Sequence, residues 1–132
     1  MRIGIDLDDV ILSRDNKLIN DAEKEFGLLR SWAGPSDHKG AHQLVCITSR
    51  PEKYLITAME ALMAGNIEFD EYHFLGGRHK YVVHVDYLVD NSLVVKENWL
   101  KHNPAESFIL FWTPETNEGI KKLSDVIPII SS

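Results

Sequence analysis

Residues 1–10, MRIGIDLDDV, hold the pattern from which the fold can be predicted. Residues 2–7 are a short, isoleucine-rich apolar run, which is typical of a central strand buried on both faces. Asp6, Asp8 and Asp9 crowd the end of this run, although carboxylates this close repel each other and do not belong in a core. We therefore expect a buried strand whose end carries its carboxylates into a site that neutralises them.

Strand-like and helix-like segments alternate along the rest of the chain. Further short apolar runs predict strands at 43–48, 71–75, 87–91 and 107–112. Apolar spacing and turn residues predict helices at about 15–29, 51–64, 81–85 and 94–102, a loop at 30–42, a loop and helix at 113–123, and a short end segment at 125–130 whose Pro128 favours a sheet edge. This order predicts an α/β fold: a three-layer, Rossmann-like parallel sheet of about five strands with helices on both faces.

Composition limits the function classes. A chain of 132 residues predicts one domain, 1–132, and the net charge of −6 argues against broad, non-specific binding to nucleic acid or membranes. The single cysteine, Cys46, allows no disulfide within the chain, and no signal core or bilayer-length apolar run is apparent, so we expect a cytoplasmic protein. His38 and His42 have no third ligand nearby, so no zinc site is expected there.

Ligands of parallel α/β sheets bind beyond the carboxyl ends of the strands, so a polar motif is of interest when it directly follows a strand. Asp6 and Asp8 pass this test at the end of the first strand. Their i, i+2 spacing would place both carboxylates on one side in extended backbone, where a hard cation bound by oxygens would offset their repulsion. The alternative is a helix N-cap or an acidic surface turn.

A hydroxyl pair follows the second strand. Thr48 and Ser49, with backbone N–H groups before a predicted helix, are suited to bind a phosphate, and Arg50 would add a charge-assisted hydrogen bond. The alternative is that Thr48 or Ser49 simply caps the helix.

Lys80 follows the third strand and provides a compact positive charge for a phosphate or a carboxylate. The alternative is a solvated lysine in a turn, where Arg78 and His79 compete for the same role.

Asp90 ends the fourth strand and is a candidate third oxygen ligand for the same cation, with Asp86 as a rival four residues earlier. The alternative for Asp90 is a helix cap together with the residues that follow it. An acid pair, a hydroxyl, a lysine and an acid thus follow four successive strands. Together they supply the nucleophile, proton donor, phosphate cradle and cation site that phosphoryl transfer requires.

This ordered set resembles the haloacid dehalogenase-like superfamily of phosphohydrolases. The family pattern is D-x-D-x-[TV], then Thr or Ser, then Lys, then an acidic motif. It is matched here by DLDDV at 6–10, Thr48 in ITSRP, Lys80, and Asp90-Asn91 in LVDN. The phrases IDLDDV, TSRP, FDEYHFLG and LVDN are also similar to the small cytosolic deoxyribonucleotidase branch.

The resemblance implies a role for each matched residue. Asp6 would attack phosphorus and form an aspartyl-phosphate, and Asp8 would protonate the leaving oxygen and then activate water. Thr48 would bond a phosphoryl oxygen and Lys80 would steady the nucleophile and the phosphate. Mg²⁺ would sit on Asp6, Asp90 and the main-chain carbonyl of Asp8.

The sequence also departs from the family pattern. Asp9 stands where many members have glycine, Val10 replaces threonine, and Asn91 replaces a second acid. The nucleotidase branch usually inserts a helical cap after the first motif, whereas residues 11–42 here leave room only for a helix and a loop. We therefore expect an open site. Either the substrates are large, or a partner chain in a homo-oligomer supplies the lid, or catalysis is poor.

These observations predict a Mg²⁺-dependent phosphatase that hydrolyses a phosphomonoester, with a deoxynucleoside or nucleoside monophosphate as the leading substrate. The terminal phosphate of a nucleic acid or another macromolecule is the second choice, against which the acidic net charge counts. The competing hypothesis is a non-enzymatic binding or assembly domain on a degenerate phosphatase fold.

Overall fold

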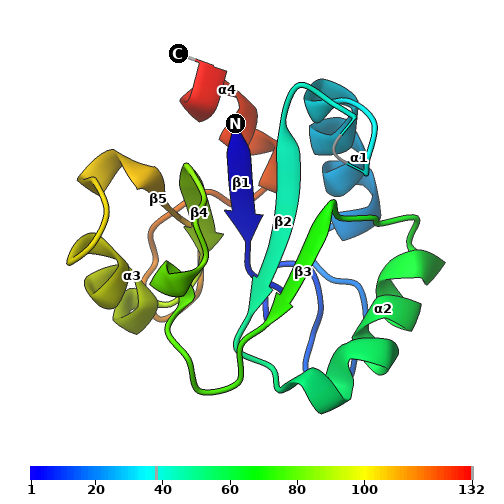
Figure 1. Cartoon of the computed structure of the whole chain (residues 1–132), viewed down its shortest axis with the longest axis horizontal. Helices are drawn as coiled ribbons and strands as arrows, with labels where there is room; N and C mark the ends of the chain where they lie inside the picture. The colour runs from blue at the N-terminus through cyan, green and yellow to red at the C-terminus, as the bar shows by residue number, and fades with distance from the viewer. Residues whose placement is uncertain (38, 132) are drawn as a thin grey trace.

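A parallel five-stranded sheet forms the centre of the molecule in the computed structural model, which describes residues 1–37 and 39–131 (Figure 1). His38 thus lies outside the described residues. The strands are β1 (Arg2–Ile5), β2 (Gln43–Thr48), β3 (Glu71–Phe74), β4 (Tyr87–Asp90) and β5 (Phe108–Leu110), in the order β3-β2-β1-β4-β5. All four strand pairs are parallel, so the predicted α/β class and parallel sheet are confirmed.

Helices cover both faces of this sheet. The helices are α1 (Ala22–Ala33), α2 (Leu55–Ala64), α3 (Leu93–Leu100) and α4 (Val126–Ser131), with 3₁₀ turns η1 (Glu52–Tyr54), η2 (Lys80–Val82), η3 (Ala105–Ser107) and η4 (Leu123–Asp125). Within the described residues, no helix is long and apolar enough to cross a membrane.

Side chains alternate along β2 between two apolar clusters, as a strand buried on both faces requires. Leu44 and Cys46 join the cluster that includes residues of α1, α2 and α4. Val45 and Ile47 join the opposite cluster, which α3 covers with Trp99. The buried apolar run that predicted a central strand at 43–48 therefore reflects helix packing on each side.

Gly4 in β1 leaves space for that second cluster. A Cβ atom at this position would lie 2.6 Å from Ile47 Cδ1, 3.2 Å from Val85 Cγ2 and 3.3 Å from Leu88 Cδ1. These three side chains fill the room that the missing side chain leaves, which lets β2 and β4 pack closely beside β1.

The first helix begins later than predicted. The expected helix at 15–29 is instead Ala22–Ala33, so the expected loop at 30–42 is partly helical. Asn16, Asn20 and Asp21 adopt left-handed backbone, with φ of 61°, 56° and 56°, and this conformation interrupts an α-helix. The apolar spacing that suggested a helix before Ala22 belongs to a tight hairpin instead.

Two predictions for the C-terminal half were also wrong. No helix occurs within 113–122, and the expected edge segment at 125–130 is helical, as η4 and α4. Pro128 is tolerated in α4 because it occupies the first turn, where backbone N–H groups have no partner within the helix.

The connection from β3 to β4 crosses the sheet without an α-helix. It spans residues 75–86, contains only η2 where a helix at 81–85 was expected, and buries Leu75 and Val83 against the second cluster. Because β2 and β1 lie between β3 and β4, this segment passes over the sheet centre and brings Lys80 to it.

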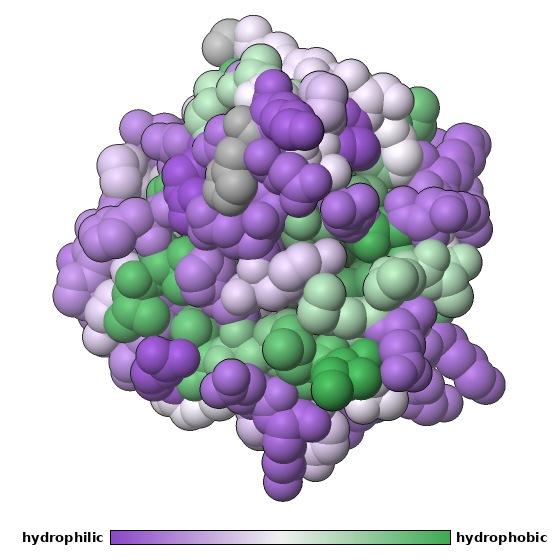
Figure 2. Space-filling view, turned by 45° about the vertical axis from the view of Figure 1, so that its right-hand side comes forward, coloured by the Kyte–Doolittle hydropathy of each residue, from purple (hydrophilic) through white to green (hydrophobic). Residues whose placement is uncertain are grey.

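Helix α2 is only partly buried. Ala58 and Leu62 are its buried residues, whereas Ile56 and Met63 are 72% and 70% exposed. Apolar residues accordingly gather in the lower part of the face seen in Figure 2. α2 therefore buries fewer of its residues than α1, whose buried residues include Phe26 and Leu29.

Two glycine substitutions test this packing. Gly27 lies exposed inside α1 with no atom within 4 Å of an added Cβ, so Gly27→Ala should raise the free energy of unfolding, by about 0.5–1 kcal/mol. Gly4→Val should lower it by about 1–3 kcal/mol through overpacking. Urea unfolding of both variants measures the difference, and equal stabilities would contradict the packing described at β1.

Candidate functional site

Buried polar side chains gather at the carboxyl edge of the sheet. This edge of the sheet lies toward the bottom of the view in Figure 1. Six polar side chains are buried among the described residues, and four of them lie here: Asp6, Thr48, Lys80 and Asp90, which are 5%, 0%, 6% and 1% exposed. Burying charged groups is costly unless they are paired, so their concentration at one edge makes this edge the candidate functional site.

The centre of this site is an ammonium group between two carboxylates. Lys80 Nζ donates to Asp6 Oδ1 at 2.6 Å and to Asp90 Oδ2 at 2.6 Å. β1 positions Asp6 one residue beyond its end, β4 ends on Asp90, and η2 begins with Lys80. The ends of two strands and the turn between β3 and β4 thus meet through one cation, as the sequence predicted for these residues.

With both carboxylates ionised, this arrangement contains more negative than positive charge. Burial and the Asp90 carboxylate raise the pKa of Asp6 to about 8, although Lys80 opposes the shift. Burial lowers the pKa of Lys80, but the two carboxylates outweigh burial and the net shift is upward. One ammonium does not compensate two buried carboxylates, so an additional cation would relieve the remaining charge.

The oxygen atoms at this edge fit a hard cation such as Mg²⁺. Asp6 Oδ2 and the main-chain oxygen of Asp8 accept no hydrogen bond from the described residues, whereas Asp90 Oδ1 accepts one from Ser92 N at 3.0 Å. In the part of the chain that the structure describes, no group of three or more His, Cys, Asp or Glu side chains is placed to hold a metal. The donor set here is instead two carboxylates and a carbonyl.

The rival acid, Asp86, lies at the other end of the sheet. Its Oδ2 accepts from the backbone N of Arg2, the first residue of β1, at 2.7 Å. Asp90 has a local bond of the kind that the helix-cap alternative predicts, because its Oδ1 accepts from Ser92 N, but its Oδ2 also binds Lys80. Ser92 itself caps α3 by accepting from Val95 N at 3.2 Å.

The Asp8 side chain pairs with a different cation from the other two carboxylates. Its Oδ1 accepts from Arg50 Nε at 2.9 Å and lies 2.8 Å from Arg50 Nη2. The backbone N of Arg50 in turn donates to Thr48 Oγ1 at 3.1 Å. The expected contact of Arg50 with a substrate phosphate stays a prediction, and in the structure the guanidinium faces Asp8.

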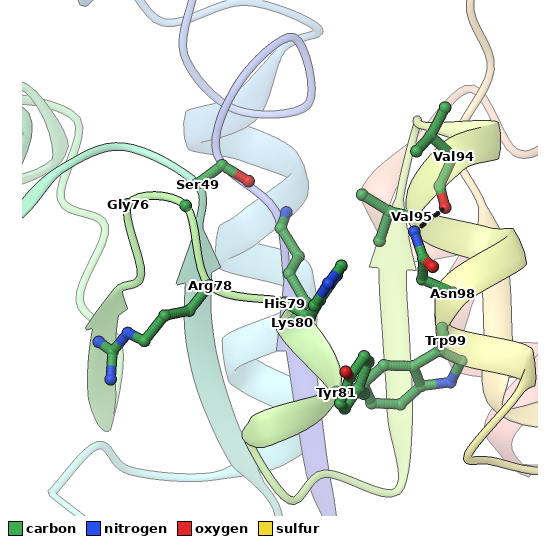
Figure 3. A pocket seen from close by; sticks show the side chains of 11 residues that line it. Ser49, Gly76, Arg78, His79, Lys80, Tyr81, Val94, Val95, Asn98 and Trp99 are labelled. Atoms are coloured by element: carbon green, nitrogen blue, oxygen red, sulfur yellow. Dashed lines mark hydrogen bonds between the residues drawn. The ribbon is translucent and has the colours of Figure 1, made fainter.

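Two hollows flank the central residues. The first, of about 200 Å³, is lined by Ser49, Lys80, Tyr81, Val95 and Trp99 among others, and Figure 3 shows Lys80 and Ser49 together beside it. Arg78 extends to the opposite side from Lys80 in this view, while His79 stacks on Tyr81 with ring centroids 5.0 Å apart. Of the three candidates in this turn, only Lys80 reaches the carboxylates.

The second hollow is a cleft of about 480 Å³ on the side of Asp8. Asp8 and Arg50 line it together with Arg14, Asn16, Pro51, Tyr54 and Thr57. The sequence analysis assigned no function to Arg14 or Asn16. The turn-like run SRDNK at 13–17 could have indicated a hairpin there in place of the expected helix. The proximity of this run to Arg50 depends on the tertiary fold.

Among the described residues of 11–42 there is no helical cap separate from α1. α1 packs its buried face on the sheet, and only the hairpin that precedes it borders the cleft. This placement agrees with the expectation of a short segment without a lid.

The raised pKa of Asp6 predicts a pH-dependent stability. In EDTA, the folded protein should hold a proton on Asp6 between about pH 4, where an unfolded aspartate titrates, and about pH 8. The free energy of unfolding should therefore fall as pH rises through this range, by at most about 1.4 kcal/mol per pH unit. Thermal unfolding should show this trend, and Mg²⁺ should stabilise more at pH 8 than at pH 6 because protons compete with the metal.

Asp6→Asn should remove both effects, and Asp9→Asn is the matched control. An Asp6→Asn variant with the pH and Mg²⁺ dependence of the wild type would show that Asp6 is not the titrating group.

Comparison with known proteins assigns no family to this site: no family model, curated protein or solved structure matches the chain. Its chemistry must therefore be inferred from its own residues.

Proposed function

We propose that the protein is a Mg²⁺-dependent phosphomonoester hydrolase of the haloacid dehalogenase-like type, which acts through an aspartyl-phosphate. The observation that supports this proposal best is the buried bridge from Lys80 Nζ to Asp6 and Asp90 at the carboxyl edge of the sheet. A nucleophilic carboxylate, a neutralising lysine and a second acid are the groups that such a reaction needs at one point.

The reaction has two steps. An Asp6 carboxylate oxygen attacks phosphorus, the bond from phosphorus to the leaving oxygen breaks, and Asp8 gives a proton to that oxygen. A water molecule then attacks phosphorus, Asp8 takes its proton, the bond from phosphorus to Asp6 breaks, and phosphate leaves. Asp6 and Asp8 are then in their starting states.

Two further groups would hold the phosphoryl oxygens. Thr48 Oγ1 accepts from Arg50 N, which leaves its hydroxyl proton available to donate to an oxygen of the substrate. Lys80 lies against Asp6, where its positive charge would stabilise the phosphoryl oxygens of the substrate. Ser49 is exposed at the edge of the first hollow, where it can reach a bound phosphate.

Mg²⁺ would be held by Asp6, Asp90 and the main-chain oxygen of Asp8, and when bound it would offset the charge of phosphate and carboxylates. Asn91, in place of a second acid, adds no charge to this set. The proposal names a phosphomonoester as substrate, with a nucleotide as the leading choice.

Loss of the nucleophile should abolish the activity. With Mg²⁺ and either p-nitrophenyl phosphate or a panel of nucleoside monophosphates, Asp6→Asn should lower kcat by at least roughly 1,000-fold, because no other residue forms the covalent intermediate. Asp9→Asn is the control: it makes the same change three residues away, and asparagine tolerates the left-handed backbone of Asp9 (φ 62°). No Mg²⁺-dependent and Asp6-dependent turnover on any substrate would favour a binding or assembly domain.

The metal requirement should separate the two rival acids. Asp90→Asn should raise the Mg²⁺ concentration needed for half-maximal activity by more than about 10-fold, since even groups that only support metal ligands are worth 10–100-fold. Asp86→Asn should leave it unchanged, because Asp86 bonds the start of β1. A Mg²⁺ titration of both variants checks this, and the reverse result would show that the metal ligand is wrongly assigned.

A further inference from the structure

Residues 11–19 form a short hairpin beside the second hollow; we call this segment the flap hairpin. Ile19 N donates to Ile11 O at 3.0 Å, and Ser13 N donates to Lys17 O at 2.8 Å. Lys17 N also donates to Ser13 Oγ at 3.1 Å, and Asn16 makes the left-handed turn. The flap hairpin is thus closed by its own hydrogen bonds, and its tip lines the cleft that contains Asp8.

One guanidinium ties this hairpin to the site. Arg50 Nη2 donates to Ser13 O at 3.0 Å, and Arg50 Nη1 donates to Asn16 Oδ1. Arg50 Nε donates to Asp8 Oδ1 at 2.9 Å. All three nitrogen atoms therefore have partners within the protein, on two segments, and the Arg50 side chain is only 12% exposed.

An arginine that serves as a phosphate ligand would present its paired N–H groups to the substrate. Arg50 uses this geometry on the protein itself, whereas Arg14 lies exposed in the same cleft and donates no side-chain hydrogen bond to the described residues. The planar fork of Arg50 is well suited to hold several acceptors at fixed angles, which a lysine at this position would not do.

We propose that Arg50 is a positioning residue that locks the flap hairpin to Asp8, so that the proton donor and the wall of the cleft beside it are held as one unit. The catalytic half of this proposal is that Arg50 acts on the reaction through Asp8. It deepens the proposed function and rests on it. The structural half, the locking of the hairpin, does not depend on any activity.

The catalytic half makes a distinctive prediction about the leaving group. p-Nitrophenolate departs as a stable anion, whereas an alkoxide must receive a proton from Asp8 as its bond to phosphorus breaks. If Arg50 acts through Asp8, its loss should matter much more for an alkyl phosphate. If Arg50 binds the phosphoryl group, its loss should matter equally for both substrates, since both carry the same group.

Steady-state kinetics of Arg50→Ala and Arg50→Lys test this half, with p-nitrophenyl phosphate and a simple alkyl phosphomonoester as substrates. We expect Arg50→Ala to lower kcat for the alkyl substrate at least roughly 10-fold more than for p-nitrophenyl phosphate, within the range that general acid catalysis contributes. KM and inhibition by inorganic phosphate should change little. Arg50→Lys should recover part of the loss, and Arg14→Ala, a cation in the same cleft, should leave the ratio between substrates unchanged.

Equal losses for both substrates together with weaker inhibition by phosphate would overturn the proposal and make Arg50 a phosphate ligand. Asn16→Gly provides a second variant, because it removes one acceptor of the guanidinium and tolerates the left-handed backbone of residue 16 (φ 61°).

Limited proteolysis tests the structural half independently of activity. Arg14 and Lys17 are exposed trypsin sites within the flap hairpin. Cleavage there should become faster in Arg50→Ala and Asn16→Gly, while cleavage after the exposed Lys121 should keep its wild-type rate. Unchanged cleavage in both variants would overturn the lock. Absence of phosphatase activity in the wild-type protein would refute the proposed function, and the catalytic half of this proposal with it. Faster cleavage of the flap hairpin in the two variants would still support the lock in that case.

Discussion

The ammonium of Lys80 between Asp6 and Asp90 is the interaction on which the rest of the site depends. Two carboxylates at the ends of adjacent strands would repel each other strongly in a buried environment, and removing one partner from such a group leaves an uncompensated charge. Lys80 makes the pair tolerable without fully neutralising it. In our proposal, this edge binds a cation through the negative charge of the ionised pair and through the Asp6 oxygen that accepts no hydrogen bond from the described residues.

The fold brings these groups together through its connectivity. β1 and β4 are neighbours in the sheet, so Asp6 and Asp90 lie at adjacent strand ends. Lys80 must come from elsewhere, and the crossover from β3 to β4 supplies it because that crossover passes over the centre of the sheet. Leu75 and Val83 anchor the crossover in the core on either side of the lysine, which fixes its position without an α-helix.

Much of this arrangement could be predicted from the sequence, because strands buried on both faces produce uninterrupted apolar runs. The five strands and the positions of Asp6, Thr48 and Asp90 at their ends follow from such runs. The start of α1 could not be found in the same way, since Leu18 and Ile19 have apolar spacing that suits a helix and a hairpin equally. Only the backbone conformation of Asn16, Asn20 and Asp21 separates the two.

The choice among similar residues was also beyond the sequence. Arg78, His79 and Lys80 are adjacent basic residues in one turn, and which of them reaches the carboxylates depends on which side chain points toward the sheet. The partners of Arg50 were equally hidden, because Asp8 and Asn16 are more than thirty residues away in the chain and meet it only in the tertiary fold.

The most direct test of the account is to trap the covalent intermediate. Asp8→Asn should still accept a phosphoryl group from p-nitrophenyl phosphate, whose leaving group needs no proton, but should hydrolyse the intermediate slowly because no base activates water. Mass spectrometry of the quenched protein, with Mg²⁺ present, should then show one phosphoryl group on the peptide that contains Asp6. An unmodified peptide, or a phosphoryl group that persists when Asp6 is also replaced by asparagine, would contradict the assignment of Asp6 as the nucleophile.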